Sequence, residues 1–187
     1  MEQMKLKEIF KFALNRIGEH EGDRQITNIV ISGINAGYKI IAIKNKKTKQ
    51  IPITAELNVP VSLPVDFINL VLLQKEGVDG GRLSPNDYFS ESDILLVTNL
   101  DVVGDLTMYY NYIPVDLVYG IDDEKEPSIQ AAYHIALASY AAYYYFIFKK
   151  DFNAATMCLN EFNAITGLAE TTEINSDQPN IQESNKK

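Results

Sequence analysis

Two histidines have the widest chemical repertoire in this sequence, and they stand in different surroundings. His20 lies in a turn with Glu19, Glu21 and Asp23, and an imidazole among carboxylates could hold a divalent cation. A solvated turn between two helices explains the same residues without a metal, and we favour that interpretation. His134 lies in a strongly apolar stretch, where a hydrogen-bonded core or interface histidine is a better explanation than a metal ligand or a general base.

An acidic run and a single cysteine are the other candidates for chemistry. Asp122, Asp123 and Glu124 could coordinate calcium or magnesium, but the run lacks the alternating spacing and the glycine of a calcium-binding loop. Its place just ahead of an expected helix explains it, because carboxylates stabilise the positive end of a helix dipole. Cys158 lies among apolar residues at helical spacing, which favours a small core residue over a nucleophile.

Short motifs of the common enzyme classes are missing from the sequence. It contains no GxxxxGK[ST], GxGxxG, CxxC, HExxH or GxSxG. Paired carboxylates for acid–base catalysis need a pocket, and the sequence points to none. We therefore expect a protein that is not an enzyme and needs no cofactor. A small metal-dependent enzyme that uses His20 is the less favoured alternative.

Composition limits the partners and the compartment. The 187 residues are 46% hydrophobic, which suffices for one domain with a real core and an inserted subdomain. The net charge of −8 argues against a surface that grips nucleic-acid phosphates, and the lone basic cluster, residues 44–49, is interpreted as a solvated turn. The N-terminus does not resemble a signal peptide, and the apolar run at 135–148 is shorter than the roughly 20 residues that span a bilayer. We expect a soluble protein made in the cytoplasm, with no membrane contact.

Helical periodicity predicts four helices, over residues 5–19, 24–44, 127–149 and 152–166. Asp23 and Asp151 are suitable N-caps for the second and fourth, and Gly167 is a suitable end for the last. The third helix is expected to start at Pro127 and is apolar on nearly all sides, so several elements or another subunit must cover it. Gly33 and Gly37 lie on the apolar stripe of the second helix and predict a close approach of another helix.

Between the second and third helices the apolar pattern changes to the period of a β-strand. Ile51, Ile53 and Ala55 alternate with polar residues, and Pro52 favours an edge strand. Further strands are expected after Pro64 and around residues 94–99 and 105–113. The predicted fold is α+β and mainly α, a bundle of about four helices with an inserted small antiparallel β subdomain. Its divisions are residues 1–49, 50–119, 120–168 and 169–187.

The last division is a polar tail without aromatic residues, and we expect it to be disordered unless it binds a partner. Ile174 and Ile181 are its larger apolar residues and are candidates for docking on that partner.

Tyrosine is unusually concentrated in the third helix and just before it. Most of the eleven tyrosines lie between Tyr109 and Tyr145, and positions 143–145 are consecutive, so they spread around the helix. A tyrosine-rich core and a subunit interface are both open, because tyrosine buries a large ring and keeps a hydroxyl group for a partner. The candidate interface residues are Tyr133, Tyr140, Tyr143, Tyr144 and Tyr145.

Several segments, taken in order, resemble a known family. They are LPVDFINLV, the strand DLTMYYNYIPVDL, the acidic turn IDDEKEP, and the helices AAYHIALASYAAYYYF and DFNAATMCLNEFNAI. This order is similar to that of the head-to-tail connector (adaptor) proteins of tailed bacteriophages, in which a "YY…P" strand end precedes an acidic turn and an Ala/Tyr-rich helix. Here these features are Tyr109, Tyr110 and Pro114, then 122–126, then 131–148. The β insertion is larger than in the minimal four-helix connectors.

The resemblance covers roughly residues 5–168 and implies a structural virion protein of the neck. Such proteins form a homo-oligomeric ring, commonly of twelve subunits, which docks under the portal protein and continues the DNA channel through which the viral genome is ejected. The next neck or tail protein binds to the ring, and the C-terminal segment commonly reaches the portal. An acidic chain suits a channel through which DNA slides without sequence-specific binding. Another tail component, such as a tail-completion or baseplate subunit, is the alternative.

Overall fold

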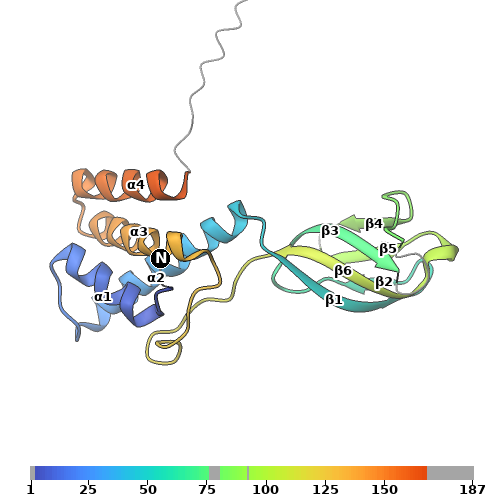
Figure 1. Ribbon diagram of the computed structural model, residues 1–187, viewed down its shortest axis with the longest axis horizontal. Coiled ribbons are helices and arrows are strands. Elements are labelled where there is room, and N and C mark those ends of the chain that lie inside the picture. The colour runs from blue at the N-terminus through green and yellow to red at the C-terminus, as the bar shows by residue number, and fades with distance from the viewer. Residues whose placement is uncertain (1–2, 76–80, 92, 168–187) are drawn as a thin grey trace, which may run out of the picture.

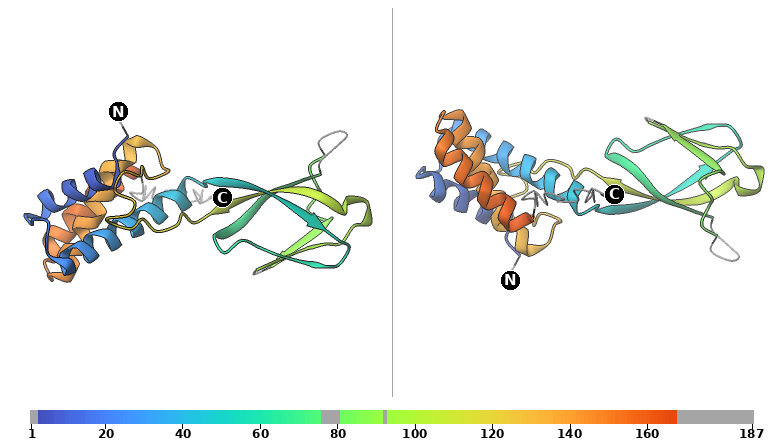
Figure 2. Two further views of the ribbon diagram at one scale, coloured as in Figure 1. Left: turned by 90° about the horizontal axis from the view of Figure 1, so that it is seen from below. Right: turned by 90° about the horizontal axis from the view of Figure 1, so that it is seen from above.

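The chain folds into a helical head that carries a long β arm (Figure 1). The computed structural model describes residues 3–75, 81–91 and 93–167. Within these ranges the head contains four α-helices, α1 (Leu6–Ile17), α2 (Arg24–Lys44), α3 (His134–Phe148) and α4 (Phe152–Thr166). The arm continues from the C-terminal end of α2 and projects from one end of the head in both views of Figure 2. The predicted α+β, mainly α fold with an inserted antiparallel β subdomain is confirmed.

Capping groups set the ends of the helices much as predicted. The Asp23 carboxylate accepts hydrogen bonds from the backbone amides of Gln25 and Ile26, at 2.7 and 3.2 Å, and starts α2. The Asp151 carboxylate accepts the amide of Ala154 at 3.1 Å and starts α4. Gly167 ends α4 with a φ of +63°, a left-handed conformation that glycine adopts at little cost.

The start of α3 differs from the prediction. Pro127 is not in the helix; a 3-10 turn at 131–133 precedes α3, which begins at His134. Tertiary hydrogen bonds hold residues 127–130 outside the helix. The Tyr38 hydroxyl accepts the Ser128 amide at 3.0 Å, and the Pro127 carbonyl is 3.2 Å from the Nε2 atom of His134.

The acidic run 122–124 lies at a helix start, but the helix is α1 and not α3. The backbone amides of Leu6 and Lys7 donate to the carbonyls of Lys125 and Asp123, at 2.9 and 3.1 Å. These bonds satisfy two of the amides that a helix leaves unpaired at its first turn. Glu124 also forms salt bridges with Lys5 and Lys7. The hydrogen bond with Lys5, and after it the one with Lys7, lowers the pKa of Glu124 to about 2.

The helix α3 is the centre of the head and packs against α1, α2 and α4. Two glycines of α2 allow its closest approach, as predicted. A Cβ atom on Gly33 would lie 2.6 Å from the Cα atom of Ala141, and one on Gly37 would lie 3.1 Å from the Cβ atom of Tyr140. The apolar length of α2 would suffice to cross a membrane, a property shared with core helices of soluble proteins, and here its glycine stripe packs on α3.

The arm consists of two antiparallel sheets that enclose a small core of their own. The first sheet has the order β1 (Thr48–Ala55), β6 (Gly104–Tyr112), β3 (Phe67–Lys75), and the second β2 (Pro60–Ser62), β5 (Ile94–Val97), β4 (Tyr88–Glu91). The predicted antiparallel β subdomain therefore consists of two sheets, and Pro52 lies on an edge strand, as predicted. Buried residues between the sheets include Leu73, Leu95, Leu106 and Met108.

The chain enters and leaves the arm through the paired strands β1 and β6, which form the base of the arm. Lys49 of β1 forms a salt bridge with Asp66, and the Tyr110 hydroxyl donates to the same carboxylate at 3.0 Å. Burial would raise the pKa of Asp66, but the bonds from Lys49 and Tyr110 outweigh it and leave this pKa below its ordinary value. Burial and the contact with Asp66 raise the pKa of Tyr110 to about 12. These contacts fasten the β2–β3 turn to the base of the arm.

Candidate functional site

The predicted His20 site is a turn between α1 and α2 whose carboxylates have structural partners. Glu19 accepts a hydrogen bond from the Tyr145 hydroxyl, Glu21 lies 3.9 Å from Lys11, and Asp23 caps α2. Among the residues that the structure describes, no group of three or more His, Cys, Asp or Glu side chains is arranged to hold a metal ion. The turn therefore gives no support to metal chemistry.

His134 is a buried core residue that joins three segments. Its Nδ1 atom accepts the backbone amide of Met4 at 2.9 Å, and its Nε2 atom lies 3.2 Å from the carbonyl of Pro127. Because Nδ1 is an acceptor, the proton of the neutral ring belongs on Nε2, where it can be donated to that carbonyl. The side chain is fully buried and both nitrogens are used, which agrees with the predicted hydrogen-bonded core histidine.

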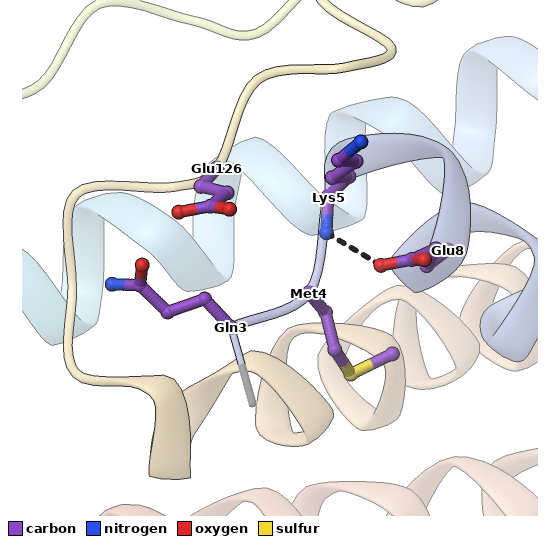
Figure 3. Close-up of a pocket in the computed structure, with 5 residues that line it drawn as sticks. All are labelled: Gln3, Met4, Lys5, Glu8 and Glu126. Atoms are coloured by element: carbon purple, nitrogen blue, oxygen red, sulfur yellow. Dashed lines mark hydrogen bonds between the residues drawn. The ribbon is translucent and has the colours of Figure 1, made fainter. Parts of the chain in front are cut away.

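A hollow at the N-terminus includes Met4, whose backbone amide donates to His134 (Figure 3). It is lined by Gln3, Met4, Lys5, Glu8 and Glu126. Figure 3 shows the Glu8 carboxylate turned back to the Lys5 amide, which it accepts at 2.8 Å as part of the α1 cap. Of the two carboxylates in the hollow, one is thus occupied by a backbone group, and we assign no chemistry to this place.

The five tyrosines proposed for an interface lie in different environments. Tyr145 is 5% exposed and donates to Glu19, and its burial and this bond raise its pKa to about 12. It is a core residue of the head. Tyr133 is half-buried against the same core. Tyr144, in contrast, is 38% exposed.

Tyr144 forms one aromatic cluster with the two remaining tyrosines, Tyr140 and Tyr143. The ring centroids of Tyr140 lie 5.3 Å from Tyr143 and 5.6 Å from Tyr144, and those of Tyr143 and Tyr144 lie 6.1 Å apart. Phe162 of α4 packs on Tyr140 at 4.6 Å. The cluster connects α3 with its neighbours and reaches the surface at Tyr144.

An apolar groove begins at Tyr144. We call it the α2–α3 groove, and its walls are Asn28, Ile29 and Ser32 of α2 and Tyr144, Ile147 and Phe148 of α3. Ile147 and Phe148 are 42% and 50% exposed. By helical periodicity alone, Ile29 and Ile147 belong to apolar stripes that would face the core. Ile147 and Phe148 stand just before Lys149 and Lys150, at the end of an apolar helix, and this position is the signal that could have separated them from the core.

Basic residues adjoin the groove, and we call them its basic rim. Arg24 lies one helical turn before Asn28, and Lys149 and Lys150 follow Phe148 directly. All three are exposed, and within the described ranges none of them forms a salt bridge. The acids nearest to them in sequence, Asp23 and Asp151, accept the backbone amides of the helices that they cap. The local charge of the rim is therefore positive on a chain that is acidic as a whole.

A second exposed apolar surface lies on the segment that leads from the arm to α3. We call residues 113–130 the acidic connection; in Figure 1 it loops out on the side of the head opposite α4. Val115, Val118 and Ile121 are 75%, 46% and 79% exposed. Asn35 of α2 holds this segment, because its side chain exchanges hydrogen bonds of 3.0 and 2.8 Å with the backbone of Leu117. Sequence reasoning missed Asn35, which stands among the apolar residues of α2.

Ile174 and Ile181, the predicted docking residues of the tail, lie outside the described residues. Comparison of the sequence with models of known protein families and with curated proteins gives no match. We therefore infer the function from the sequence pattern and from the two apolar surfaces of the head.

Proposed function

We propose that this protein is a structural virion protein, a head-to-tail connector that forms a ring between the portal and the tail of a bacteriophage. The observation that carries the proposal is the α2–α3 groove on a head that already has a complete core. Ile147 and Phe148 remain exposed although α3 is buried against three helices of its own chain. An exposed apolar surface beside a finished core is typical of a site for another protein.

The division into head and arm fits this function. The head offers the surfaces for neighbouring subunits, and the arm, with a β1 strand of about 26 Å at 3.3 Å per residue, reaches well beyond it. We assign the head to the ring and the arm to contact with the next neck or tail protein. The tail after residue 168 is assigned to the portal, as the family resemblance implies.

The native mass of the purified chain tests the proposal, measured alone and then with the portal protein encoded nearby in its genome. A ring, or a monomer that becomes a stoichiometric ring on the portal, is the expected result and gives the number of subunits. A chain that ignores the portal and remains a monomer or dimer contradicts the proposal. In that case binding to purified tail proteins would test the alternative, a tail-completion or baseplate subunit.

A further inference from the structure

A closed ring needs two different surfaces on each subunit, because every subunit contacts one neighbour with one side and the next with the other. The head has two exposed apolar surfaces, the α2–α3 groove and the acidic connection. They lie on different sides of α2. Asn35, which holds the connection, is far around the helix from Ile29, which lines the groove.

The two surfaces differ in shape in a complementary way. The groove is a depression between two helices with Tyr144, Ile147 and Phe148 along one wall. The connection ends in a tight turn at 118–122 that carries Ile121, whose side chain is 79% exposed. The turn is braced, since Asp122 accepts the Val118 amide at 2.8 Å and Asp123 accepts the Gly120 amide at 2.7 Å. A braced turn loses little conformational entropy when it binds.

The charges of the two surfaces are also complementary. The connection contains five carboxylates and one lysine. Asp116 pairs with Lys39, Asp122 with Lys125, and Glu124 with Lys5 and Lys7. Asp123 and Glu126 form no salt bridge in the described part of the chain. The groove has the opposite character, because Arg24, Lys149 and Lys150 beside it form no salt bridge within the described residues. Two grooves facing each other would bring like charges together, which disfavours a symmetric dimer through this surface.

We propose that the turn at 118–122 of one subunit inserts Ile121 into the α2–α3 groove of the next. This inference rests on the proposed ring, and it identifies the two surfaces through which neighbouring subunits would bind. Ile121 packs against Ile29, Tyr144 and Phe148 of the neighbour. The carboxylates beside Ile121 face the basic rim of the groove.

Two complementary variants test this contact, Ile121→Asp on the turn and Phe148→Asp in the groove. Both side chains are half or more exposed in the single chain, so each variant should fold, and circular dichroism with thermal melting checks this. Each variant alone should assemble more than about tenfold less well than the wild type, because it lacks one half of every contact. An equimolar mixture should give a 1:1 heterodimer and nothing larger, since a single intact contact remains between the two variants.

Met157→Asp is the matched control, because Met157 is 73% exposed on α4 and belongs to neither surface; it should assemble as the wild type does. Rings formed by Ile121→Asp alone, or a mixture that stays monomeric while the wild type forms rings, would overturn this contact and leave the connector function standing. A wild type that does not assemble at any concentration, alone or with the portal, would overturn both.

Discussion

At the scale of single residues, Asp66 is the clearest electrostatic contributor to stability. Its pKa is below the ordinary value of 3.8 because the bonds from Lys49 and Tyr110 outweigh the effect of burial. A carboxyl group with a lowered pKa stabilises the fold above its unfolded pKa, and the contribution is lost as the pH falls through the folded pKa.

We expect Asp66→Asn to lower the free energy of unfolding by about 1–2 kcal/mol at pH 7. The difference from the wild type should shrink as the pH falls below 3.8. Urea titrations at pH 7 and pH 3, followed by circular dichroism, give both values. An equal difference at the two pH values would show that the charge on Asp66 does not act through these bonds.

At Gly33, a substitution that favours the helix locally should destabilise the protein through packing. Alanine is a better helix former than glycine by about 1 kcal/mol. Its methyl group, however, would lie 2.6 Å from the backbone of Ala141, and overpacking costs about 1–3 kcal/mol. Gly33→Ala should therefore lower the melting temperature. Gly81→Ala is the control, because nothing lies within 4 Å of the added methyl group.

Substitutions at two adjacent tyrosines of α3 should affect different properties, one the assembly of subunits and the other the stability of the fold. Tyr144→Asp should block ring formation while helix content stays unchanged, because Tyr144 lines the groove and is 38% exposed. Tyr145→Phe should leave assembly intact and lower stability by about 1 kcal/mol, because it removes the bond to Glu19 inside the head. Native mass and thermal melting of both variants give the comparison. Normal rings from Tyr144→Asp would remove the groove from the interface.

At the scale of elements, the arm should be dispensable for the folding of the head. It has a core of its own, and its entry and exit are side by side, since Thr48 pairs with Asn111. A variant in which a short glycine–serine link replaces residues 48–112 should keep the helical circular dichroism signal and the ability to assemble. The proposed binding to the next neck or tail protein should be lost. A head that unfolds without the arm would contradict this prediction.

The sequence predicted those elements whose signals are local. Asp23 and Asp151 marked helix starts correctly, and Gly33 and Gly37 marked the close contact of α2 with α3. The start of α3 was missed because Tyr38, ninety positions away from Ser128, decides it. Periodicity could not rank Tyr144 and Tyr145, since α3 is apolar on every side. Tertiary packing decides between them, because Tyr145 lies in the core of the head and bonds Glu19 of the α1–α2 turn. The division of the β subdomain into two sheets depends on strand pairing, which alternation does not specify.

At the scale of the whole molecule, the head should not depend on the polar tail. The helix α4 ends at Thr166, whose carbonyl accepts a hydrogen bond from Lys44 at 2.6 Å, and Gly167 closes it. Removal of the residues after Leu168 should leave the melting temperature unchanged and weaken binding to the portal protein. Ile174→Asp with Ile181→Asp in the full chain is the matched test of the two apolar residues. Undiminished portal binding by the truncated chain would exclude the tail from docking.

The paired strands β1 and β6 at the base of the arm also bear on how such a protein can evolve. Both ends of the arm meet in one pair of neighbouring strands, so a single recombination event that spans residues 48–112 exchanges the whole arm and leaves every helix contact of the head in place. Under the proposed connector function, such an exchange would supply a new arm and, with it, a new tail partner. In the proposed ring, the head surfaces would meanwhile remain under selection to match the surfaces of neighbouring copies. We therefore expect the arm to diverge faster among relatives than the groove and the connection, which must change together.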